Sequence, residues 1–180
     1  MTNSYPKFAL LEVVMSSYFE LLGIEKKYDI DLLILDSQYF AMQLKYHPDR
    51  INSNREKQKN LSISIDINKA YATLKDDLSR AEYLLLLNNI VLDDITVRQG
   101  ISKEELNVIW NELELVETTQ QLTKLQSMLN NKILEKQQLT KSLTTAFQNH
   151  NMQDAIDITI RFKYLENLIN NIQLKIKSCK

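Results

Sequence analysis

A histidine and an aspartate on either side of a proline, His47-Pro48-Asp49, are the residues of this sequence best suited to chemistry. An imidazole beside a carboxylate could act in acid–base catalysis, but that needs a pocket and a group that orients the imidazole. A metal site would need more ligands, and His150 is the only other histidine. We therefore predict no catalytic residue, no metal and no cofactor. Two interpretations of the tripeptide remain: a loop that docks another protein, or an ordinary turn that ends a helix.

The elements around this tripeptide are predicted to be two helices. Pro48 lacks an amide hydrogen and disfavours the helical conformation in the residue before it, so a helix should end near His47. Asp31 is a good N-cap for that helix. Residues 51–60 are polar and charged, with residues 52–54 as a loop, and a third helix should follow, with its apolar positions over residues 63–74. Since the connection is short, the two helices should lie antiparallel.

Composition favours an all-α protein without nucleic acid or membrane partners. The 180 residues include two glycines and two prolines, too few for the turns of a sheet protein. The net charge of -1 gives no electrostatic case for binding nucleic acid or an anionic membrane. No apolar run is long enough to span a membrane, and residues 1–16 make a poor signal peptide, so we expect a cytoplasmic protein. Cys179, the single cysteine, is interpreted as an incidental thiol.

The second half of the chain predicts a bundle of three helices. Residues 80–87 read as a short fourth helix, and residues 89–101 lack a clean period and read as a linker. Ser102 and Glu105 form a capping-box pattern that should start a helix over residues 103–118. Two longer helices follow, and the apolar positions of the last one alternate three and four apart. This seam could support self-association, but filling the bundle core is the more frequent explanation, so a monomer is expected.

The helix over residues 103–118 has apolar residues on two sides. Trp110, the only tryptophan, lies on the broader side, which Glu114 and Glu117 border, whereas Val108 and Leu115 fall opposite. An aromatic anchor with charged neighbours fits an interface, but both sides could also be covered by the rest of the protein. The pattern alone leaves these two interpretations open.

Three segments, in this order, resemble a J domain, the module by which co-chaperones engage DnaK-class ATPases. They are residues 18–23 (YFELLG), 46–49 (YHPD) and 67–74 (INKAYATL). Residues 79–85 (SRAEYLL) and the helix containing residues 112–115 (ELEL) further resemble the HscB family, J-domain co-chaperones of iron–sulfur cluster biogenesis.

The resemblance implies an L-shaped, all-α protein with two domains. Residues 17–88 would form the J domain, residues 89–101 the linker, and residues 102–180 a three-helix scaffold-binding domain. Residues 1–16 are left unassigned.

The resemblance also implies two partners. An HscA-like ATPase chaperone would be contacted, and its ATP hydrolysis stimulated, through Lys45, His47, Pro48, Asp49 and Arg50. An IscU-like cluster scaffold would be bound through Ile109, Trp110, Leu113, Glu114, Glu117 and Tyr164.

One departure from the J-domain pattern concerns charge. The second helix of many J domains is basic and steers the domain to its partner, whereas Lys45 is the only base on that helix here. Electrostatic steering of the partner should be weak, or shifted to the basic residues beyond Pro48, which are Arg50, Arg55, Lys57 and Lys59.

The alternative function is a general J-domain co-chaperone of a DnaK-class chaperone with a different client.

Overall fold

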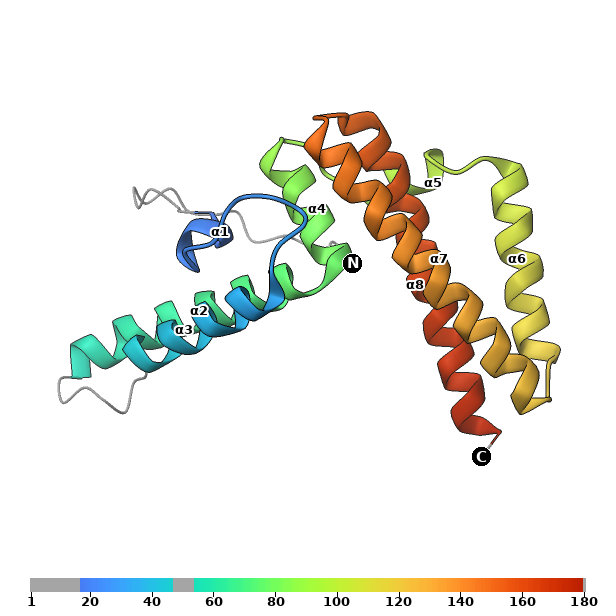
Figure 1. Cartoon of the computed structure of the whole chain (residues 1–180), viewed down its shortest axis with the longest axis horizontal. Helices are drawn as coiled ribbons and strands as arrows, with labels where there is room; N and C mark the ends of the chain where they lie inside the picture. Colours follow the sequence, from blue (N-terminus) through green and yellow to red (C-terminus); the bar gives the residue numbers. More distant parts are fainter. Residues whose placement is uncertain (1–16, 47–53, 180) are drawn as a thin grey trace, which may run out of the picture. The chain divides into compact units, whose positions relative to one another are not determined.

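The computed structural model describes residues 17–46 and 54–179, and within these ranges it contains helices and no strands, which confirms the all-α prediction (Figure 1). The helices are α1 (Tyr18–Leu21), α2 (Leu32–Tyr46), α3 (Asn54–Lys75), α4 (Asp77–Leu87), α5 (Asp94–Gln99), α6 (Lys103–Thr118), α7 (Leu122–Gln148) and α8 (Met152–Ser178). Two compact units contain them. The first holds the described residues of Met1–Lys26 and Ile34–Tyr71, and the second holds those of Lys27–Leu33 and Ala72–Lys180.

In the first unit, α2 and α3 form the predicted antiparallel pair. Hydrogen bonds join Gln43 to Ser64, Tyr39 to Asn68 and Asp36 to Tyr71, so the position on α3 rises as the position on α2 falls. The rings of Tyr39 and Tyr71 stack with centroids 4.0 Å apart. This pairing fixes which face of α2 is left exposed.

The third helix begins earlier than the sequence predicted. α3 starts at Asn54, which was predicted to belong to the loop over residues 52–54, so the helix already includes the polar residues 54–60. Most side chains in this stretch are Arg, Glu, Lys and Gln, which are good helix formers. Since this stretch lacks apolar residues, it gives no helical period in the sequence, and the period begins only beyond it.

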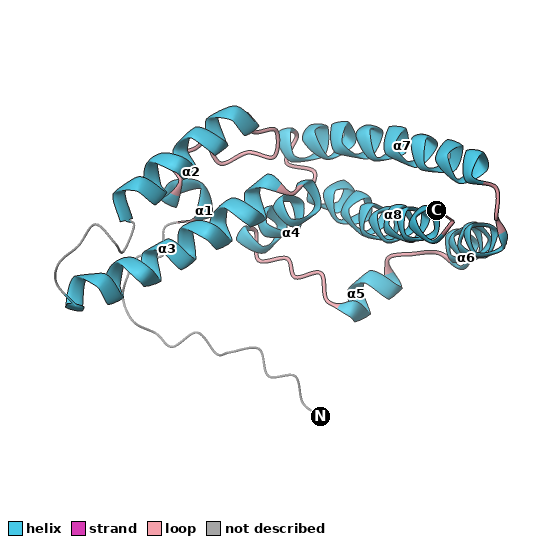
Figure 2. Ribbon diagram, turned by 90° about the horizontal axis from the view of Figure 1, so that it is seen from below, coloured by secondary structure: helices cyan, strands magenta, loops and turns pink. Residues whose placement is uncertain are grey.

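The second unit is organised around α8, which contacts α4, α6 and α7 (Figures 1 and 2). One buried cluster, Val116, Leu125, Leu168 and Ile172, joins α6, α7 and α8. Another, Leu85, Ala146 and Ala155, joins α4 to α7 and α8. Each of these helices therefore depends on α8 for a surface against which to bury its apolar stripe.

The stretch predicted as a linker contains the short helix α5. Val97 of α5 and the following Ile101 are buried against Ile160 of α8. A β-carbon at Gly100 would collide with the Ile160 side chain, so the glycine lets the backbone pass close to α8. This stretch is packed on the bundle through two anchoring side chains.

The capping box at the start of α6 is confirmed. The Glu105 amide donates to Ser102 Oγ at 3.1 Å, and the Ser102 amide donates to the Glu105 carboxylate at 3.1 Å. The Ser102 amide and hydroxyl both donate to the Glu105 carboxylate, and these two bonds lower the pKa of Glu105. Arg161 of α8 lies 2.9 Å from the other Glu105 oxygen and ties the first turn of α6 to the bundle.

Arg80 is a buried charge that links α4 to the preceding chain. It is 4% exposed, its Nε donates to the Tyr28 carbonyl at 2.8 Å, and its guanidinium also bonds the Leu74 carbonyl and pairs with Asp77. The guanidinium carbon lies 4.9 Å from the centroid of the Tyr28 ring, and that ring stacks on Phe147 of α7. One arginine thus satisfies two buried carbonyls and supports an aromatic pair.

None of the helices in the described part of the chain has both the length and the apolar character needed to cross a bilayer.

Replacing Arg80 should destabilise the second unit strongly. Arg80→Ala leaves two buried carbonyls and Asp77 without their partner, and we expect a loss of about 3 kcal/mol in the free energy of unfolding by urea. Arg98→Ala, at an exposed arginine of α5, is the control and should change it by less than about 0.5 kcal/mol. Equal effects for both variants would contradict this role for Arg80.

The buried phenol of Tyr28 predicts a loss of stability in alkali. Burial raises the pKa of Tyr28, and the nearby Asp77 carboxylate raises it further. The folded state therefore keeps the proton at a pH where the unfolded chain has lost it, so this contribution is full below about pH 10 and decreases above it. Thermal melts from pH 8 to 11 should show Tyr28→Phe losing less stability than the wild type above pH 10. Parallel curves would refute the assignment.

Candidate functional site

Of the residues predicted to dock a chaperone, only Lys45 lies in the described part of the chain. His47, Pro48, Asp49 and Arg50 fall outside it. Lys45 is exposed in the last turn of α2, and its ammonium lies 5.2 Å from the centroid of the Tyr46 ring. α2 ends at Tyr46, next to the predicted helix end.

The exposed face of α2 carries apolar side chains rather than basic ones. Phe40 is 63% exposed and Leu44 is 60% exposed, and Lys45 is the only base on the helix. The described part of α2 therefore offers a partner apolar contact area and little positive potential.

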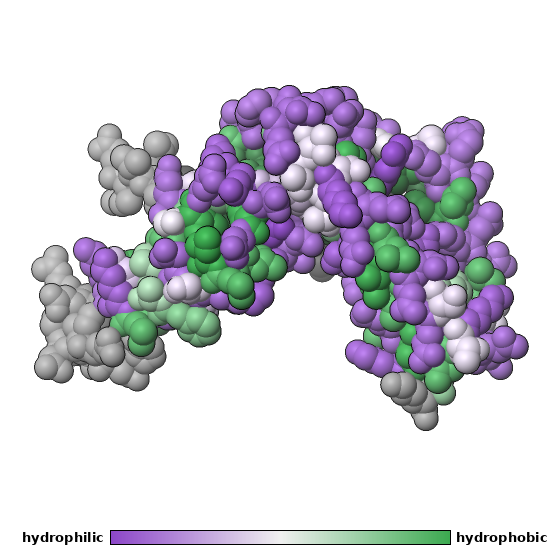
Figure 3. Space-filling view, in the orientation of Figure 1, coloured by the Kyte–Doolittle hydropathy of each residue, from purple (hydrophilic) through white to green (hydrophobic). Residues whose placement is uncertain are grey.

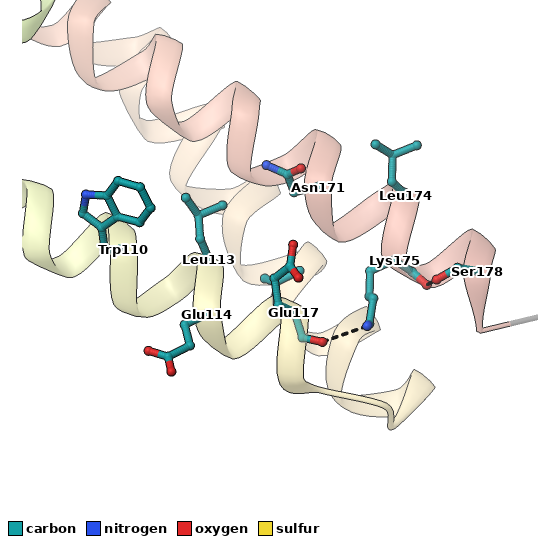
Figure 4. A pocket seen from close by; sticks show the side chains of 9 residues that line it. Trp110, Leu113, Glu114, Glu117, Asn171, Leu174, Lys175 and Ser178 are labelled. Atoms are coloured by element: carbon teal, nitrogen blue, oxygen red, sulfur yellow. Dashed lines mark hydrogen bonds between the residues drawn. The ribbon is translucent and has the colours of Figure 1, made fainter.

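Four of the predicted scaffold-binding residues meet in one groove of about 920 Å³ between α6 and α8. Trp110, Leu113, Glu114 and Glu117 come from α6 (Figure 4). Val116 lies at the base, and the α8 side is lined by Asn171, Leu174, Lys175 and Ser178.

The position of Trp110 follows from the rotation of α6. Val116 is buried in the bundle and Leu113 is half-buried beside it, whereas Trp110 lies further around the helix and is 67% exposed. Figure 3 shows that polar side chains cover most of the visible face of α6–α8 and that apolar patches interrupt them. An exposed tryptophan beside a half-buried leucine is the arrangement typical of an interface anchor.

The charges around the groove are mainly negative. Glu114 and Glu117 are both exposed. Lys175 Nζ donates to the Glu117 carbonyl at 2.7 Å, so this ammonium is held near the last turn of α6 (Figure 4). The rim of the groove is therefore suited to a partner that places lysine or arginine next to an apolar side chain.

The other two predicted residues lie elsewhere. Ile109 and Tyr164 pack at the cluster formed by Val97, Ile101 and Ile160, and they line a second hollow of about 500 Å³. This hollow shares no lining residue with the groove. The structure thus brings together Trp110, Leu113, Glu114 and Glu117, and places Ile109 and Tyr164 apart from them.

Lys132 of α7 helps to hold α6 in place. Its Nζ lies 2.6 Å from Glu112 of α6 and 2.9 Å from Glu135. Burial by itself lowers the pKa of Lys132, but the hydrogen bonds to Glu112 and Glu135 outweigh that effect and raise it. This lysine stays charged and links two helices.

The α8 side of the groove was not found by sequence reasoning. Leu174 and Asn171 lie next to the buried seam residue Ile172 without belonging to the seam. A leucine off the apolar stripe of a helix was the one available signal, but an isolated exposed leucine is common on protein surfaces.

Two family models match the chain. The DnaJ domain model matches residues 17–83, and the model described as the HSCB C-terminal oligomerisation domain matches residues 104–173. Together they account for more than half of the chain.

Curated relatives of this chain include HscB proteins. The co-chaperone protein HscB of Proteus mirabilis is 49% identical over 75 residues, which are 41% of this chain and 43% of that protein. The iron–sulfur cluster co-chaperone protein HscB homolog of Arabidopsis thaliana is 28% identical over 162 residues, covering 88% of this chain and 63% of that protein. The matched part therefore spans less than two thirds of either relative.

The fold agrees with these matches. The crystal structure of the human co-chaperone protein HscB superposes with a TM-score of 0.85 at 25% sequence identity, covering 91% of this chain and 83% of the human one. The order of the two family matches and the shared fold point to one assignment: this chain belongs to the HscB family of J-domain co-chaperones.

Proposed function

We propose that this protein is a co-chaperone in iron–sulfur protein maturation. Residues 17–88 would act as the J domain on a DnaK-class, HscA-like ATPase, and residues 102–180 would hold an IscU-like cluster scaffold, with residues 89–101 connecting them. The observation that carries the proposal is the pair of family matches on one chain, with the α6–α8 groove lying inside the second match.

The groove supports the scaffold-binding half of the proposal. Its centre is apolar, with Trp110 exposed and Leu113 half-buried, and its rim carries two glutamates. Binding energy at interfaces concentrates in buried aromatic and aliphatic anchors, whereas rim charges select the partner and steer its approach. The groove therefore suits a protein partner.

The proposed action on the ATPase chaperone does not require this chain to make or break a covalent bond. The DnaJ match spans His47, Pro48 and Asp49, and we propose that these residues contact the ATPase, with Asp49 accepting hydrogen bonds from an arginine. Docking would act by binding the hydrolysis-competent conformation of the chaperone more tightly than the other conformations. Holding the scaffold on the same chain raises its local concentration at the chaperone.

His47→Gln should separate the two activities. We expect stimulation of the ATPase of an HscA-like chaperone to be lost, because the substitution removes the imidazole of the docking tripeptide. Scaffold affinity should stay within about twofold of the wild type, because the groove lies on other helices. Steady-state ATP turnover and a scaffold titration measure these effects. Lys69→Gln, an exposed residue of α3, is the control. Stimulation that persists in His47→Gln would refute the docking assignment.

Trp110→Ala combined with Leu113→Ala should weaken scaffold binding at least about tenfold, because both side chains provide the apolar centre of the groove. Calorimetric titration with the purified scaffold measures this effect. Leu115→Ala is the matched control, since Leu115 is an exposed residue of α6 that lines neither the groove nor the second hollow. Unchanged binding in the double variant would instead favour a general J-domain co-chaperone with a different client.

A further inference from the structure

One face of α2 is exposed and carries no charged side chain. Asp36, Tyr39 and Gln43 form hydrogen bonds with α3, which runs along the opposite side of α2 (Figures 1 and 2). Five exposed positions of the first unit lie on the other side, and at 100° per residue they cover about 120° of the helix surface. We call them the outer face of α2, and they are Ile34, Ser37, Phe40, Ala41 and Leu44.

Three side chains of the outer face are large and apolar. Ile34 is 53% exposed, Phe40 is 63% exposed and Leu44 is 60% exposed. Leu35, on the side that faces α3, is fully buried, so α2 already has a buried apolar side without these residues. A surface helix usually turns polar residues to the solvent. α2 carries apolar residues on both sides instead, which is typical of a helix that a partner covers.

The charges of α2 lie off the outer face. Asp36 accepts a hydrogen bond from the Tyr71 hydroxyl of α3 at 2.8 Å, and Lys45 stands in the last turn, at the edge of the face. An acidic partner surface would lose its hydration against apolar side chains, and it would find only Lys45 on α2 to pair with. An uncharged, apolar surface is therefore the complement of this face.

The size of the outer face favours a transient partner over a second copy of this chain. Residues 34–44 span roughly 15 Å along the helix axis. Two copies joined by this face would bury far less than the roughly 800 Å² per partner of a standard stable interface. A small contact suits a partner that binds and leaves in each cycle, as an ATPase chaperone would. The predicted docking tripeptide begins three residues after Leu44, and the DnaJ match includes both.

We propose that α2 selects the chaperone by apolar contact. The ATPase presents an uncharged, apolar patch to Phe40 and Leu44, and an acidic residue meets α2 only at Lys45. Recognition therefore depends little on salt, whereas a basic J-domain helix attracts its partner by charge. This inference rests on the proposed docking function and names the chemistry of the surface on which α2 docks.

The test is a titration of the ATP turnover of a purified HscA-like chaperone with the full-length protein at 50 and 300 mM salt. The wild-type concentration for half-maximal stimulation should differ by less than about twofold between the two salts, because apolar contacts are not screened. Phe40→Lys and Leu44→Lys should each raise this concentration about fivefold at 50 mM salt, because each places a charge on an apolar contact. An acidic partner surface would give the opposite result, a lower concentration for both variants, and would overturn the proposal.

Leu134→Lys is the matched control, since Leu134 is a leucine of α7 that is 57% exposed and lies outside α2. It should stimulate the chaperone like the wild type. Phe40→Ala removes apolar contact without adding a charge and should raise the half-maximal concentration about threefold. Thermal melts and scaffold affinities of all variants should match those of the wild type, because the substituted side chains are exposed and the groove lies on other helices.

The outcomes separate this inference from the proposed function. Lost stimulation in His47→Gln with wild-type stimulation by both lysine variants of α2 would overturn the apolar recognition and leave chaperone docking intact. No stimulation by the wild type would overturn the proposed function, and this inference with it. A wild-type protein that dimerises by light scattering, and a Phe40→Lys variant that does not, would assign the outer face to a second copy and overturn the inference.

Discussion

The buried face of α8 is the constraint on which the second unit depends. Its fully buried residues include Ala155, Phe162 and Ile172, and the helix contacts α4, α6 and α7. Burying each large apolar side chain contributes roughly 1.5–3 kcal/mol, far more than an exposed ion pair. α6 owes its rotation to this packing. With Val116 turned into the core, Trp110 lies further around the helix and remains exposed.

Polar links then set the position of each helix on α8. Arg161 pairs with Glu105 at the start of α6, Lys175 bonds the carbonyl of Glu117 at its end, and Lys163 bonds Glu82 of α4. These contacts are partly exposed, so each contributes little to the free energy of unfolding. They join both ends of α6, and one turn of α4, to α8.

Periodicity and capping patterns predicted most of the helices, because these signals are local. The Ser102–Glu105 box and the stripe of the last helix are readable within a few turns of sequence. The early start of α3 and the packing of α5 were missed, since a polar helix end and two anchoring side chains leave no periodic signal. The domain boundary at residues 89–101 stays a prediction.

The candidate site likewise contains residues that the sequence indicated and residues that it did not. The resemblance and the pattern of α6 indicated Trp110 and its neighbours, which the structure brings together. Which part of α8 would lie opposite could not be predicted, because it depends on how the helices cross. The placement of Ile109 and Tyr164 at a separate hollow is likewise a tertiary property.

The central claim is that the groove between α6 and α8 is the surface that receives the scaffold. Hydrogen–deuterium exchange of the full-length protein, with and without saturating scaffold, tests it most directly. Slowed exchange in both residues 110–117 and residues 171–178, with α7 residues 133–141 unchanged, is the result expected, because contact at the groove suppresses local opening of the two helices that line it. Protection confined to α7, or no protection in either groove segment, would contradict the claim.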